Sequence, residues 1–154
     1  MGYLTSIQSK LINISGNVTW RLLRTEPRIN IAIPIIGLPF ESFRKYLGAR
    51  AVALGYDFEP PLYPESLRPL LEAPPPEGCY KSKKILSIHG ELDELVPIAQ
   101  GQEDIQLVVD VAKQGDVEVW VQEGAGHVVT VEMVKKTAEW IWRWAVEAEQ
   151  SASL

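Results

Sequence analysis

The sequence alternates short runs of apolar, β-branched residues with longer stretches of helical periodicity, and this alternation restricts the fold more than any other feature. Residues 28–37 and 84–90 are almost continuously apolar, as are strands that are covered on both faces. Residues 98–113 and 130–147 carry apolar side chains at helical spacing, and each follows a strand-like run. Strands separated by helices indicate parallel pairing through helical crossovers. The chain is therefore expected to form a layered α/β sheet.

Two further segments extend this pattern, and two others interrupt it. Residues 116–122 alternate polar and apolar like a strand at a sheet edge, and residues 17–26 are compatible with a short helix. About three parallel strands with flanking helices are thus predicted. Residues 38–80 contain eight of the eleven prolines and are expected to leave the sheet as an insertion. Residues 1–15 show no such pattern and are interpreted as an unrelated or degenerate leader.

Helical spacing also predicts which side chains face the sheet. For the helix at 98–113 we expect Ile105, Val108, Val109 and Ala112 to point inward. For the helix at 130–147 we expect an apolar face of Val131, Val134, Ala138, Ile141, Trp142 and Ala145.

Length and composition narrow the possible classes of protein. The 154 residues, 46% hydrophobic and 23% charged, suit one globular domain over residues 1–154. The net charge of −5, with dispersed Lys and Arg, argues against a nucleic-acid partner. The single cysteine, Cys79, and the two histidines, His89 and His127, allow neither an internal disulfide nor a zinc motif, so no metal and no cofactor is expected. With no signal peptide and no apolar run near the roughly 20 residues of a membrane span, a cytoplasmic location is expected.

Asp93 and His127 are the candidate catalytic residues. Each follows a predicted strand, and the carboxyl ends of parallel strands meet at one rim, so the two side chains are expected to lie together. An aspartate that accepts a hydrogen bond from one imidazole nitrogen prepares the other nitrogen to take a proton from a nucleophile. Gly124 and Gly126, which have no Cβ, are expected to let the loop before His127 turn sharply.

The residues around this pair carry a family resemblance. His89 to Pro97, H-G-E-L-D-E-L-V-P, resembles the H-G-x-x-D-x-x-V-P segment that bears the triad acid in many α/β-hydrolases. Gly124 to His127, G-A-G-H, resembles the G-x-G-H segment that bears their histidine. The chain is thus similar to the C-terminal half of an α/β-hydrolase.

This resemblance implies an activity and an arrangement of parts. Residues 28–37 would be the family's sixth strand, and residues 38–80 would be the cap that shapes the substrate pocket. His127 would act as general base and acid, with Asp93 orienting it. The implied reaction is hydrolysis of an ester, thioester or peptide bond in a small-molecule or peptide substrate, without a cofactor.

The family's nucleophile elbow is not recognisable. A G-x-S-x-G turn should lie between the fifth strand and the next helix, but none of the nine serines has glycine at both required positions. Aligning Gly16 with the glycine that opens the helix puts Asn13 at the nucleophile position. Ser15 is the nearest hydroxyl and therefore the candidate nucleophile.

Several interpretations stay open at this point. The chain could be a truncated hydrolase with weak or no activity alone, or a short paralogue that serves as a non-catalytic binding or regulatory module. A third possibility is that it does not fold stably, since an unpaired sheet edge exposes backbone groups; the same edge could support a homo-oligomer. His89 is expected to be a buried structural residue, and no role is assigned to Glu91 or Glu94.

Overall fold

The described part of the chain is built on one parallel β-sheet. The computed structural model describes residues 16–39, 54–55, 66, 69, 73–112 and 116–147, together with the backbone of residues 9–13. Its strands are β1 (Ser9–Asn13), β2 (Ile29–Pro34), β3 (Lys84–Gly90) and β4 (Val117–Gln122). They lie in the order β1-β2-β3-β4, and every neighbouring pair is parallel. The predicted parallel sheet with β4 at one edge is confirmed.

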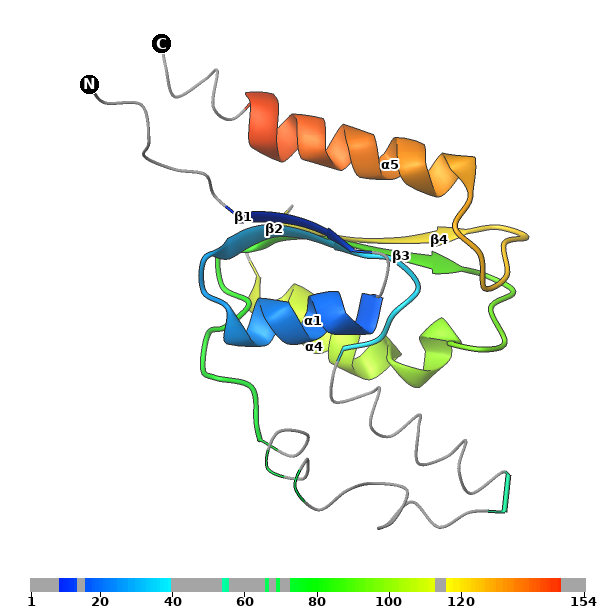
Figure 1. The fold of residues 1–154 in the computed structure, drawn as a ribbon, viewed down its shortest axis with the longest axis horizontal. Coiled ribbons are helices and arrows are strands. Elements are labelled where there is room, and N and C mark those ends of the chain that lie inside the picture. The colour runs from blue at the N-terminus through cyan, green and yellow to red at the C-terminus, as the bar shows by residue number, and fades with distance from the viewer. Residues whose placement is uncertain are drawn as a thin grey trace.

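Helices cover both faces of this sheet. The longer helices are α1 (Gly16–Thr25), α4 (Gln102–Val111) and α5 (Val131–Ile141), accompanied by the 3-10 turn η2 (Ile98–Gln100) and the π-helical turn η3 (Trp142–Glu147). Helices α1 and α4 lie on one face and α5 on the other (Figure 1). This three-layer arrangement is the predicted fold class.

The helix predicted over residues 98–113 is divided in two. Gly101 separates η2 from α4 and lies so close to Leu38 that a Cβ at this position would come within 2.6 Å of the Leu38 side chain. Ile105 and Val108 face the sheet as predicted, whereas Val109 and Ala112 are only half-buried.

The sheet contains one strand more than the sequence pattern predicted. Strand β1 pairs with β2 from Ser9↔Ile29 to Asn13↔Pro34, so part of the segment interpreted as a leader belongs to the sheet. A five-residue strand with polar residues at both ends is too short for its periodicity to be distinguished from a loop. Strand β1 belongs to the sheet because it pairs with β2, and the whole of helix α1 separates these two strands in the sequence.

Two clusters of buried side chains form the core, one on each face of the sheet. The α5 face holds Ile31, Ile33, Ile35, Leu86, Ile88, Ala125, Met133, Trp140 and Ala145. The face covered by α1 and α4 holds Trp20, Leu23, Ile29, Ala32, Tyr80, Ile85, Ile105 and Val108. Alternate residues of β2 and β3 enter opposite clusters, which explains why both strands are apolar along almost their whole length.

The predicted inner face of α5 is wrong. The helix buries Met133, Thr137 and Trp140, while Val131 and Val134 are 65% and 56% exposed. Helix α5 has apolar side chains on more than one side, and the sheet takes the side with the larger Met133 and Trp140. Ala145 is buried as predicted, but Trp142 is 55% exposed and donates a hydrogen bond to Glu147.

The start of α1 packs directly against the chain that leaves β2. A Cβ on Gly37 would lie 2.4 Å from the Cα of Gly16, and a Cβ on Gly16 would lie 2.6 Å from the carbonyl oxygen of Ile35. Trp20, which is completely buried, donates its indole N–H to the carbonyl of Gly37 at 3.2 Å. The two glycines therefore allow the first turn of α1 to contact the end of β2.

Substitution of Gly37 by alanine should destabilise the fold through this contact. We expect Gly37→Ala to lower the free energy of unfolding by about 1–3 kcal/mol, because the new methyl group overlaps backbone atoms that cannot move freely. Gly126→Ala is the matched control, since a Cβ there meets its nearest atom at 3.8 Å. Chemical denaturation of both variants measures the difference, and equal stabilities would contradict the proposed packing constraint.

Candidate functional site

The structure brings Asp93 and His127 together at the carboxyl ends of the strands. Asp93 follows β3 and His127 follows β4. The imidazole Nδ1 of His127 lies 3.0 Å from Oδ2 and 3.2 Å from Oδ1 of Asp93. An Nδ1–H directed at the carboxylate leaves Nε2 as the ring nitrogen that can take up a proton.

The Asp93 carboxylate is buried and held by the backbone. Its side chain is 2% exposed, and Oδ1 accepts the N–H groups of Leu95 and Val96, both at 2.9 Å. The His127 side chain, by contrast, is 42% exposed. The aspartate thus has a fixed position in the protein, while the imidazole lies at the surface where it could meet a reacting group.

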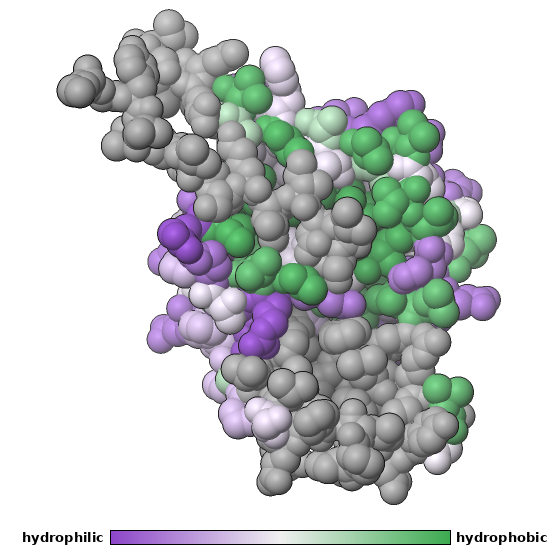
Figure 2. All heavy atoms as spheres, in the orientation of Figure 1, coloured by the Kyte–Doolittle hydropathy of each residue, from purple (hydrophilic) through white to green (hydrophobic). Residues whose placement is uncertain are grey.

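Exposed apolar side chains occur on the same two loops. Leu92 and Leu95 next to Asp93, and Val128 and Val129 after His127, are between 46% and 61% exposed. Figure 2 shows hydrophobic residues gathered on the side of the molecule where the strands end. The pair therefore lies beside apolar surface.

Of the two glycines predicted to shape the loop that carries His127, Gly124 has the expected conformation and Gly126 does not require glycine. Gly124 has a φ of +68°, which supports the expected sharp turn. Gly126 has space for a Cβ, so its glycine is not required sterically. The position with no space is Gly90 at the end of β3, where a Cβ would lie 2.5 Å from the carbonyl oxygens of both Ala125 and Gly126. Gly90 is the glycine of the H-G motif and ends a predicted strand, so the sequence did contain a signal for this close contact.

Glu91 also contacts the His127 loop, although the sequence analysis gave it no role. Its Oε2 accepts the N–H of Gly124 at 2.9 Å. Glu91 and Glu94 are both exposed, as acidic loop residues usually are, so no local pattern in the sequence distinguished them.

The elbow position lies between β1 and α1. Strand β1 ends at Asn13 and helix α1 begins at Gly16, so the strand and helix that flank a nucleophile elbow are both present. Asn13 ends β1 beside Pro34, the last residue of β2, at the same rim as the Asp93–His127 pair. Ser15, the candidate nucleophile, lies outside the described residues.

Comparison with solved structures identifies this arrangement. TT1662 from Thermus thermophilus matches with a TM-score of 0.65 and 23% identity, over 88% of this chain and 53% of that protein. The Pyrococcus furiosus esterase Pf2001 matches with 0.57 and 24% over 88% and 53% of the two chains, and SOBER1 from Arabidopsis thaliana with 0.56 and 19% over 87% and 51%. The fold is that of part of an α/β-hydrolase.

This chain spans about half the length of the solved α/β-hydrolase structures that it matches. No protein-family model and no curated protein matches its sequence. At these identities the structural likeness establishes the α/β-hydrolase fold, and the chemistry has to be argued from the site itself.

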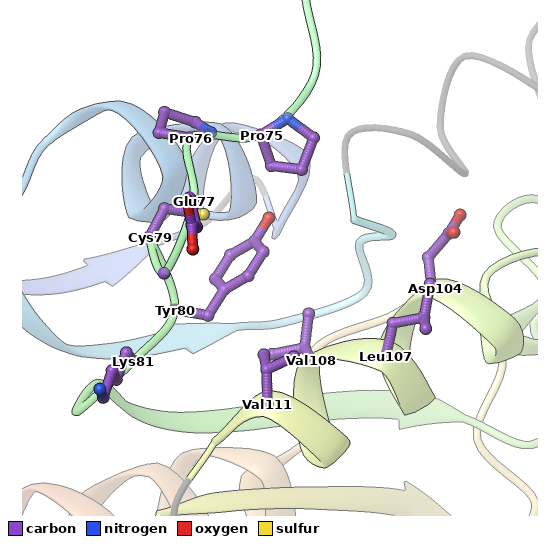
Figure 3. A pocket seen from close by; sticks show the side chains of 11 residues that line it. Pro75, Pro76, Glu77, Cys79, Tyr80, Lys81, Asp104, Leu107, Val108 and Val111 are labelled. Carbon is purple, nitrogen blue, oxygen red and sulfur yellow. The ribbon is translucent and has the colours of Figure 1, made fainter.

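A pocket of about 580 Å³ lies away from the edge of the sheet where Asp93 and His127 are found. It is lined by Pro75, Pro76, Glu77, Gly78, Cys79, Tyr80, Lys81, Asp104, Leu107, Val108 and Val111. Figure 3 shows the Tyr80 ring on one side and the α4 residues Val108 and Val111 on the other. Neither Asp93 nor His127 contributes to the lining, so this pocket is separate from the candidate site.

Two other kinds of site are not found in the described residues. Within residues 16–39, 73–112 and 116–147 and the few described positions between them, no three His, Cys, Asp or Glu side chains are grouped to bind a metal ion. No helix in the same part of the chain is long and apolar enough to cross a membrane.

His89 is buried within β3, on the face covered by α1 and α4. Its side chain is 1% exposed, and Nε2 lies 2.7 Å from the Ser87 hydroxyl. Burial lowers the pKa of His89 to about 4 because the charged imidazolium would lose its hydration, and the nearby Asp93 acts in the opposite sense. His89 is therefore neutral at pH 7.

This shift predicts a loss of stability in mild acid. Histidine titrates near pH 6.5 in an unfolded chain, whereas the pKa of His89 in the folded chain is about 4. Between these two pH values the unfolded state binds a proton that the folded state does not bind. The stability lost over this range should reach about 3 kcal/mol. Above pH 6.5 both states are neutral and His89 contributes no pH dependence.

Denaturation measured between pH 7 and 4 can isolate this effect. We expect His89→Gln to show a shallower decline in stability than the unmodified chain, whatever its stability at pH 7. A decline equally steep in His89→Gln would show that other groups cause the acid sensitivity.

Proposed function

We propose that this chain supplies the acid and the base of a serine hydrolase that cleaves ester, thioester or peptide bonds. The observation that carries the proposal is the contact of His127 Nδ1 with the buried carboxylate of Asp93 at 3.0 Å. The esterase fold of the neighbouring structures supports a hydrolase rather than another use of this pair. The substrate would be a small molecule or a peptide, reached in the cytoplasm.

The reaction would follow from the two ring nitrogens of His127. A nucleophile hydroxyl attacks the carbonyl carbon of the substrate, and its proton passes to Nε2 while Asp93 holds Nδ1–H. The same proton then moves to the leaving group as the bond to that group breaks, which leaves an acyl-enzyme. Water repeats the sequence, with the serine as leaving group, and releases the acid.

The nucleophile belongs at the turn between β1 and α1. Ser15 is the hydroxyl-bearing candidate at this turn, but it lacks the glycines that allow a strained elbow. We therefore propose that the chain by itself has weak or no activity, as expected of a protein that spans half of its structural neighbours.

Hydrolysis of 4-nitrophenyl acetate at high protein concentration tests the acid and base roles. We expect a slow rate that falls at least about tenfold in His127→Ala and clearly in Asp93→Asn, because the general base or its orientation is lost. Glu94→Gln, an exposed neighbour on the same loop, should retain the rate. A rate clearly above the uncatalysed background that is equal in all four proteins would overturn the assignment.

A fluorophosphonate probe tests the nucleophile separately. We expect little or no labelling of the isolated chain, because the elbow glycines are missing. Labelling of Ser15 that disappears in His127→Ala and in Ser15→Ala, but persists in Ser82→Ala, would contradict the expected weak activity and establish a working triad. Ser82 is a suitable control because it precedes β3, at the opposite end of the sheet from the rim.

The second candidate function is a non-catalytic binding or regulatory module. The alignment of Asn13 with the nucleophile position at the end of β1 favours it, since an amide cannot replace the attacking hydroxyl. Stoichiometric binding of an ester or peptide without turnover, unaffected by His127→Ala, would support this module. Self-association through a sheet edge would be a further property of such a module.

A further inference from the structure

We propose that Glu91 is a positioning residue, which holds the loop that carries His127 so that the imidazole stays against Asp93. The hydrogen bond from Gly124 N–H to Glu91 Oε2, at 2.9 Å across 33 positions of sequence, points to this role. The catalytic consequence rests on the proposed function, whereas the structural claim does not.

The two loops at the rim are joined by hydrogen bonds from consecutive residues. The N–H of Glu91 donates to the carbonyl of Gln122 at 2.9 Å, and the N–H of Leu92 donates to the carbonyl of Ala125 at 2.8 Å. The Glu91 carboxylate adds the bond to Gly124 between these two. The first two residues after β3 are thus hydrogen-bonded to three of the four residues from Gln122 to Ala125, on the segment that leads to His127.

Gly124 lies where the chain leaves the strand conformation after β4. Regular pairing of β4 with β3 ends at Gln122, and the φ of +68° at Gly124 turns the chain out of the strand conformation. The amide of Gly124 therefore has no place in the β-ladder, and the Glu91 carboxylate accepts it instead. A hydrogen bond to a carboxylate is stronger than one to a neutral acceptor.

Two carboxylates of the same loop therefore act on the His127 loop at different points. Asp93 contacts the imidazole itself, and Glu91 contacts the turn three residues before it. The imidazole is 42% exposed, so its own packing leaves it some freedom. Fixing the turn limits the positions from which the histidine can approach Asp93.

Amide hydrogen exchange and the imidazole N–H proton signal of the full chain test this role without requiring turnover. In Glu91→Ala we expect the exchange of the Gly124 amide to accelerate about fivefold, since a hydrogen bond is lost. The downfield proton resonance of His127 Nδ1–H, a signature of its bond to Asp93, should weaken or broaden. Glu91 is exposed, so the substitution should leave the fold intact.

Two further variants separate positioning from general effects of charge. Glu91→Gln keeps a side-chain oxygen acceptor and should preserve both signals, whereas Glu94→Ala removes a neighbouring charge and should change neither. If ester hydrolysis is measurable, Glu91→Ala should lower kcat with KM unchanged. Unaltered Gly124 exchange and an unaltered His127 resonance in Glu91→Ala would overturn the proposal, even if the hydrolase function holds. Altered signals, together with measurable ester hydrolysis that His127→Ala leaves unchanged, would uphold the positioning role and reject the proposed function.

Discussion

The parallel pairing of β3 with β4 is the constraint on which the candidate site depends. The two strands run in register from Ile85↔Val117 to Gly90↔Gln122, so they end level with one another. The chain then needs three residues to reach Asp93 and five to reach His127. Because both short loops start from the same edge of the sheet, their side chains can meet.

Close contact between the two loops turns this proximity into a defined geometry. The lack of a side chain at Gly90 lets the carbonyls of Ala125 and Gly126 approach β3, and the backbone of Leu95 and Val96 fixes the Asp93 carboxylate. The aspartate is buried and held by hydrogen bonds, while the histidine is exposed. Proton transfer requires this combination, since the base must be oriented from one side and accessible from the other.

Asp93 and His127 lie in the loops after β3 and β4, whereas the position that a nucleophile elbow would take follows β1. Strand β1, which ends at Asn13, joins the sheet through β2, and Gly16 at the start of α1 packs against Gly37. This difference matters for a chain that spans about half of the proteins it resembles, because the contact of His127 with Asp93 does not involve β1 or α1. An Asp–His pair in good order is thus compatible with a catalytic chain and with one that only binds.

The sequence by itself determined the alternation of strands and helices, the edge position of β4, and the choice of Asp93 and His127. These features are local, because a strand or helix repeats its pattern over several consecutive residues and a motif keeps its residues a few positions apart. The tertiary structure decided the rest: that Ser9–Asn13 joins the sheet, that α5 buries Met133 and Trp140 rather than Val131 and Val134, and that Glu91 bonds to Gly124. Each of these outcomes depends on contacts between segments far apart in the chain, whose energies no local pattern records.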